Sequence, residues 1–124
     1  MGAKILYIED NADNRMLVRR ILTVEDYEVF EAERGAEGID LAIRVKPDLI
    51  LMDMNLPSVD GYELTRQVRE IPELQGIPVI AMTANVMHGD REKTLEAGCD
   101  GYIPKPIDVD ALPHQIKKFL EAKL

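Results

Sequence analysis

Two short runs of this sequence are apolar at every position: Leu49-Ile50-Leu51-Met52 and Val79-Ile80-Ala81-Met82. A strand with one exposed face alternates apolar and polar residues, whereas a strand covered on both faces is apolar throughout. Strands of the second kind belong to parallel sheets, because crossover helices cover both faces of such sheets. The two runs therefore predict central strands of a parallel sheet.

An alternation of strands and helices extends along the whole chain. Short β-rich runs are followed by amphipathic segments five times, which is typical of parallel strands joined by crossover helices rather than of hairpins. The expected strands are Lys4–Ile8, Glu28–Ala32, Asp48–Asp53, Ile77–Met82 and Gly101–Ile103. Residues of the kinds that cap helices mark the expected helix starts, near Asp13, Gly35, Asp60, Met87 and Asp110. The sequence therefore predicts an α/β fold with a five-stranded parallel sheet and helices on both faces.

Length and composition limit the number of domains and the class of protein. A chain of 124 residues fits one domain, so we expect a single domain over residues 1–124 and no output domain. Hydrophobic residues make up 46% of the chain and charged residues 31%, as in folded globular proteins. The net charge of −8 argues against direct binding to nucleic acid, which needs clustered Lys and Arg side chains.

The sequence also carries signals about location. Its apolar runs are far shorter than the roughly 20 residues that a membrane-spanning helix needs, and its first residues lack the apolar core of a signal peptide. Cys99 is the only cysteine, which excludes an internal disulfide and fits a reducing compartment. We therefore expect a cytoplasmic protein that does not insert into membranes.

Charged and hydroxyl side chains follow several of the predicted strands directly. In an open parallel sheet, ligands bind beyond the carboxyl ends of the strands, where the strand order reverses. The residues at four of the strand ends are Glu9-Asp10, Asp53, Thr83 and Lys105-Pro106. The second strand ends instead at Ala32-Glu33, outside this group, as expected for a strand at the margin of the sheet.

These side chains suit metal binding and phosphoryl transfer. Three carboxylates at one edge repel one another unless they raise a pKa or share a cation, and hard oxygen ligands suit Mg²⁺ or Mn²⁺. The backbone carbonyl of Asn55 could complete such a site. The Asp53 carboxylate could attack a phosphoryl group, provided that the charge of that group is neutralised. Lys105 would supply part of that neutralisation, and the Thr83 hydroxyl could hydrogen-bond a phosphoryl oxygen.

Each of these residues also has an ordinary structural interpretation. Asp10 could belong to a helix cap and Asp53 to a turn. Thr83 could be a strand residue and Lys105 a solvated charge. Taken singly, the residues leave both interpretations open, and their joint placement at consecutive strand ends favours a chemical role.

Several motifs resemble those of the receiver domains of two-component response regulators, over essentially the whole chain. The matching segments are Glu9-Asp10, Pro47 to Pro57, Asp60 to Leu64, Ile77 to Ala84, Ala97-Gly98 and Gly101 to Pro106. The resemblance implies the flavodoxin-like sheet order 2-1-3-4-5. It also implies a signalling phosphoacceptor that assists its own phosphorylation, rather than an enzyme with an external substrate.

The resemblance implies a role for each residue at the strand ends. Asp53 would be the phosphoacceptor, and Thr83 and Lys105 would contact the phosphoryl group. A cis peptide between Lys105 and Pro106 would aim the lysine into the site. The ligands of Mg²⁺ would be Glu9, Asp10, Asp53 and the backbone carbonyl of Asn55.

The resemblance further implies a switch. Phosphorylation would pull Thr83 inward, and Tyr102 on the fifth strand would follow, changing the surface of the fourth helix, fifth strand and fifth helix. Asn55 and Asn85 match positions where the family tunes the lifetime of its acyl phosphate.

By the same resemblance, the phosphoryl group comes from a histidine kinase or a histidine phosphotransfer protein. The modified protein would then dock on a downstream protein partner or pass the group on. The chain most resembles stand-alone cell-division regulators of the DivK type. Receiver domains excised from hybrid histidine kinases are an alternative.

Two other function classes remain to be compared with this one. A phosphohydrolase of the haloacid dehalogenase type forms an aspartyl phosphate, but it needs a second aspartate where this chain has Asn55. A flavin carrier of similar strand order needs a phosphate-binding loop rich in Ser, Thr and Gly after the first strand. Glu9-Asp10 at that place would repel a phosphate, so both alternatives are disfavoured.

Overall fold

The computed structural model describes residues 2–56, 60–84 and 90–122. Within these residues the strands are β1 (Lys4–Ile8), β2 (Glu28–Ala32), β3 (Leu49–Asp53), β4 (Val79–Thr83) and β5 (Gly101–Pro104). The helices are α1 (Ala12–Val24), α2 (Gly35–Val45), α3 (Gly61–Glu70), the 3-10 helix η1 (Pro72–Leu74), α4 (Asp90–Glu96) and α5 (Leu112–Ala122). All strand pairs are parallel, in the order β2-β1-β3-β4-β5. The predicted fold class and sheet order are confirmed.

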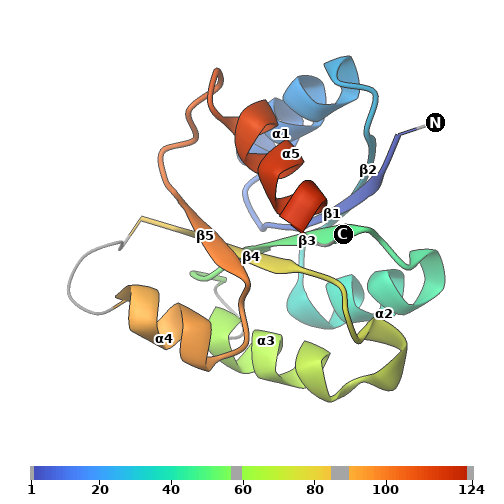
Figure 1. The fold of residues 1–124 in the computed structure, drawn as a ribbon, viewed down its shortest axis with the longest axis vertical. Helices are drawn as coiled ribbons and strands as arrows, with labels where there is room; N and C mark the ends of the chain where they lie inside the picture. The colour runs from blue at the N-terminus through green and yellow to red at the C-terminus, as the bar shows by residue number, and fades with distance from the viewer. Residues whose placement is uncertain (1, 57–59, 85–89, 123–124) are drawn as a thin grey trace.

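Helices cover both faces of the sheet, with α1 and α5 on one face and α2, α3 and α4 on the other (Figure 1). Successive strand residues face opposite layers. Tyr7 and Leu51 pack in the core beneath α1 and α5, whereas Leu6 and Ile50 pack in the core of the opposite face. Both sides of a central strand are therefore buried, which explains why its sequence is apolar at every position.

Polar side chains cap the N-termini of two helices, as the sequence predicts. The Asn11 side chain accepts a hydrogen bond from the Asn14 amide at 2.9 Å ahead of α1. The Asp60 side chain accepts one from the Tyr62 amide at 2.9 Å ahead of α3. The Asn11 cap comes soon after the end of β1, and the Asp60 cap directly precedes α3 in the chain that follows β3.

The start of α5 differs from the prediction. The helix begins at Leu112 rather than near Asp110, because the Asp108 side chain accepts hydrogen bonds from two following amides and so forms a turn ahead of the helix. The predicted helix start near Met87 lies outside the described residues. Among the helices of the described ranges, none is both long and apolar enough to span a bilayer.

The strand register aligns the residues that follow the strands. Ile8 pairs with Met52, so that the next residues along each chain segment, Glu9 and Asp53, are neighbours at the carboxyl ends of β1 and β3. Thr83 ends β4, the strand on the other side of β3. The polar strand ends predicted from the sequence therefore share one edge of the sheet.

Candidate functional site

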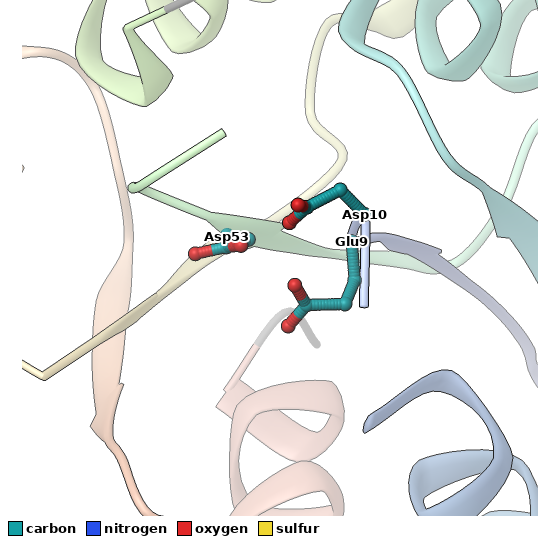
Figure 2. Close-up of side chains that lie close together, drawn as sticks. All are labelled: Glu9, Asp10 and Asp53. Carbon is teal, nitrogen blue, oxygen red and sulfur yellow. The ribbon is translucent and has the colours of Figure 1, made fainter. Parts of the chain in front are cut away.

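Three carboxylates meet at this edge (Figure 2). Glu9 and Asp10 follow β1 and Asp53 ends β3, and one oxygen from each lies within 4.8 Å of those of the other two. Glu9 and Asp53 are buried, with exposed fractions of 1% and 2%, whereas Asp10 is exposed. The acidic cluster, defined as Glu9, Asp10 and Asp53, therefore reaches the surface through Asp10.

The ammonium group of Lys105 balances the two buried carboxylates. Its Nζ lies 3.1 Å from Glu9 Oε1 and 3.1 Å from Asp53 Oδ1. Burial acts to lower the pKa of Lys105, but the hydrogen bond to Glu9 and the charges of Asp53 and Glu9 raise it overall. The Lys105–Pro106 peptide bond is cis, and the Lys105 amide donates to the Thr83 carbonyl at 2.8 Å. A protonated lysine therefore lies between the ends of β1 and β3.

Glu9 and Asp53 differ in their affinity for a proton. Burial and a hydrogen bond with Glu9 raise the pKa of Asp53 to about 6. Burial also acts to raise the pKa of Glu9, but hydrogen bonds from Asp53, Tyr7 and Lys105 lower it to about 2. The donors around Glu9 therefore favour its ionised form, whereas burial disfavours the ionised form of Asp53.

Two side chains that were not predicted from the sequence donate hydrogen bonds to Glu9. The hydroxyl of the buried Tyr7 donates to Glu9 Oε1 at 2.8 Å, and Asn14 Nδ2 donates to the same oxygen at 3.3 Å. Burial and the charge of Glu9 raise the pKa of Tyr7 far above its usual value, so its hydroxyl stays protonated. Strand periodicity could have indicated Tyr7, because residues two apart in a strand share a face.

Asn55, Thr83 and Tyr102 also belong to the predicted site, and the structure describes all three. The backbone amide of Asn55 donates to Asp53 Oδ1 at 3.0 Å. Thr83 is buried at the end of β4, beside β3. Tyr102 lies in β5 and packs, partly buried, against the core of the α2 and α3 face. Asn85 lies outside the described residues.

The acidic cluster fits a hard divalent cation. Its ligand atoms are carboxylate oxygens, which Mg²⁺ and Mn²⁺ prefer over nitrogen and sulfur ligands. The cluster holds three acidic side chains, and Lys105 contacts two of them, so a further positive charge would reduce the repulsion among the three. The donor set is therefore suited to a magnesium or manganese ion.

Comparison with known proteins shows the family of this chain. Residues 5–117 match the response regulator receiver domain. The polar-differentiation response regulator DivK of Brucella anthropi is 42% identical over 120 residues, which cover 97% of this chain and 98% of that protein.

Solved structures agree with this match. The receiver domain of a sensor histidine kinase of Pseudomonas aeruginosa, which has a magnesium ion coordinated in its active site cleft, is 36% identical with a TM-score of 0.88 over 98% of this chain and 99% of that one. The chemotaxis protein CheY4 of Vibrio cholerae has a TM-score of 0.90 at 25% identity, over 95% of this chain and 98% of that one. With its sheet order and nearly its full length shared with such proteins, the chain belongs to the response regulator receiver domains, the phosphoacceptor modules of two-component signalling.

Proposed function

We propose that Asp53 is the residue that accepts the phosphoryl group. One observation carries this assignment: the Asp53 carboxylate lies between Lys105 Nζ, at 3.1 Å, and two further acids whose oxygens are within 4.8 Å. A carboxylate in this position has a cationic group beside it to neutralise an incoming phosphoryl group. Asp10 is exposed and Glu9 is held by several donors, so neither is as well placed to act as the nucleophile.

The transfer step would proceed by attack of an Asp53 carboxylate oxygen on the phosphorus of a phosphohistidine. The new oxygen–phosphorus bond forms as the phosphorus–nitrogen bond breaks, and the imidazole leaves with the electron pair of that bond. Lys105 would move its hydrogen bond from Asp53 to a phosphoryl oxygen, and the Thr83 hydroxyl would donate to another. The donor would be a histidine kinase or a histidine phosphotransfer protein.

Glu9, Asp10, Asp53 and the backbone carbonyl of Asn55 would hold Mg²⁺ or Mn²⁺. When bound, the cation supplies positive charge that stabilises the transferring phosphoryl group. The protein's own contribution is to hold the ligands in place. The backbone amide of Asn55 donates to one oxygen of Asp53 at 3.0 Å, and Lys105 and Tyr7 donate to Glu9.

Phosphorylation would shift an equilibrium between two conformations. A phosphoryl group on Asp53 that contacts Thr83 better in one conformation favours that conformation. Tyr102 would follow Thr83, since β5 pairs directly with β4, and the surface of α4, β5 and α5 would change. That surface would bind a downstream protein partner, unless the phosphoryl group is passed to another histidine.

The protein would act as a signalling module of the cytoplasm rather than as an enzyme with an external substrate. A phosphohydrolase of the haloacid dehalogenase type needs an acid where this chain has Asn55, whose side chain is a neutral amide. Such an amide, two residues past Asp53, would instead tune how fast water removes the phosphoryl group.

Intact-mass measurement tests the assignment of Asp53. The protein is incubated with a small-molecule phosphodonor, with and without Mg²⁺, alongside Asp53→Asn. We expect wild type to gain one phosphoryl group in the presence of Mg²⁺ and Asp53→Asn to gain none. Asp40→Asn makes the same chemical change on the exposed surface of α2 and should behave as wild type. A phosphoryl group on Asp53→Asn, or no Mg²⁺-dependent gain by wild type, would refute the assignment.

A further inference from the structure

The Tyr7 side chain joins the hydrophobic core to the acidic cluster. Its ring is fully buried among apolar residues of the core beneath α1 and α5. Its hydroxyl donates to Glu9 Oε1 at 2.8 Å, just beyond the end of β1. A phenylalanine ring would fill the same space in the core, so packing explains the ring and leaves the hydroxyl to be explained by its contact with Glu9.

The three side chains that donate to Glu9 Oε1 differ in how firmly they are held. Tyr7 is the nearest, at 2.8 Å, compared with 3.1 Å for Lys105 and 3.3 Å for Asn14. Lys105 also contacts Asp53, and in the proposed function it turns to the phosphoryl group. Asn14 is partly exposed on α1, where water competes for its amide. Tyr7 is therefore the donor that neither takes part in the transfer nor faces solvent.

A buried carboxylate needs such a permanent donor. Glu9 has an exposed fraction of 1%, so water cannot readily replace a hydrogen bond that it loses. When Lys105 moves to the phosphoryl group, the Tyr7 hydroxyl keeps Glu9 Oε1 hydrogen-bonded and keeps the carboxylate in its orientation. A ligand held by an outer hydrogen bond of this kind binds its metal more tightly than one that is free to rotate.

We propose that Tyr7 is a positioning residue, whose hydroxyl holds the Glu9 carboxylate in the orientation that binds the divalent cation. This inference rests on the proposed function of the acidic cluster and adds a residue that lies in the core rather than at the strand ends. Tyr7 touches neither the cation nor the phosphoryl group and acts through Glu9 alone.

Cation affinity tests this role, measured by calorimetric titration of the full chain with MgCl₂. Loss of an outer hydrogen bond to a metal ligand weakens metal binding by about 10-fold or more, and we expect this loss in Tyr7→Phe. Tyr27→Phe is the matched control. Tyr27 precedes β2, at the opposite end of the sheet from the acidic cluster, and its substitution should leave the affinity unchanged.

A second measurement separates positioning from a loss of stability. The rise in melting temperature on adding Mg²⁺ is measured for each variant against its own cation-free form, so that a general destabilisation cancels. We expect a smaller rise for Tyr7→Phe than for wild type and Tyr27→Phe. Asn14→Ala removes another donor to the same oxygen without altering the core, and it should weaken cation binding less than Tyr7→Phe does.

Cation affinity and a Mg²⁺-dependent rise that both match wild type in Tyr7→Phe would show that the hydroxyl does not position Glu9. If Tyr7→Phe fails to fold, unchanged affinity in Asn14→Ala contradicts the proposal and weakened affinity supports it. Failure of the proposed function is a different result. In that case wild type binds Mg²⁺ more tightly than Tyr7→Phe does, yet gains no phosphoryl group.

Discussion

The carboxylates of Glu9 and Asp53 can be buried because each accepts more than one hydrogen bond. Lys105 contacts both at 3.1 Å, the Tyr7 hydroxyl contacts Glu9 at 2.8 Å, and the Asn55 amide contacts Asp53 at 3.0 Å. Desolvation of an acid without such partners costs several kcal/mol, on the order of the stability of a small domain. The same contacts that stabilise the acids also orient them toward one another.

Lys105 should weaken cation binding and assist phosphoryl transfer, and a single substitution tests both effects. Lys105→Gln removes a positive charge 3.1 Å from Glu9 and Asp53, so Mg²⁺ no longer competes with an ammonium group and should bind more tightly. Phosphoryl uptake should nevertheless slow by on the order of 100-fold, as when one preorganised donor to a developing charge is lost. Calorimetry gives the affinity and a mass time course gives the rate. Lys118→Gln, on the exposed face of α5, is the control, and weaker Mg²⁺ binding by Lys105→Gln would contradict this account.

Single residues also show what the sequence reveals about the site and what it does not. Glu9, Asp53 and Lys105 could be predicted because each ends or directly follows a strand, and parallel strands bring their carboxyl ends to one edge. Tyr7 was missed because it lies within an apolar run, where an aromatic ring is already explained by burial. Strand periodicity places Tyr7 and Glu9 on one face, but only the structure shows that the hydroxyl reaches the carboxylate.

Helices and strands differed in how well their limits could be predicted. β1 and β2 have the predicted bounds, and each is followed directly by a charged residue, Glu9 or Glu33. β4 begins at Val79 rather than Ile77, because Pro78 has no amide hydrogen for the ladder. The 3-10 helix η1 was not predicted, because a segment of three residues is too short to show periodicity.

One glycine lies a few residues before strand β4 and another a few residues before strand β5, so the effect of the same substitution can be compared at the two positions. Gly76 and Gly98 both have positive φ angles, of 83° and 107°. A Cβ on Gly76 would meet nothing within 4 Å, whereas a Cβ on Gly98 would lie 2.8 Å from Arg69 Cγ. Arg69 cannot easily move, because it donates to the carbonyls of Gly98 and Ile77 at 2.7 and 2.8 Å.

We expect Gly76→Ala to lower the free energy of unfolding by about 1 kcal/mol, from backbone strain alone. Gly98→Ala should lower it further, by about 2 to 3 kcal/mol, because the clash with Arg69 adds to the strain. Equilibrium unfolding in urea measures both values. Equal losses in the two variants would show that the Arg69 contact yields without cost.

Folding brings together charges that are far apart in the sequence. Lys105 lies 96 residues from Glu9 and 52 from Asp53, and all three meet only when β1, β3 and β5 occupy one sheet. The chain carries a net charge of −8, and part of that charge is concentrated in the acidic cluster. An ion that binds the assembled cluster therefore stabilises the native protein and not the unfolded chain.

Magnesium should accordingly stabilise the protein in two separable ways. Any salt screens the repulsion among surface acids, so KCl should raise the melting temperature slightly. MgCl₂ at the same ionic strength should raise it more: at about 10 times the dissociation constant, linkage adds roughly 1.4 kcal/mol, or about 5 °C for a chain of this size. Thermal unfolding followed by circular dichroism measures both effects.

The excess of Mg²⁺ over K⁺ should be largely lost in Asp53→Asn and retained in Asp40→Asn, since only the first removes a charged ligand from the acidic cluster. The response to KCl should be alike in all three proteins, because surface screening depends on the overall charge and one charge in eight changes it little. Equal rises with the two salts in wild type would mean that the cluster does not bind the cation. An excess that persists in Asp53→Asn would place the bound ion elsewhere on the acidic surface.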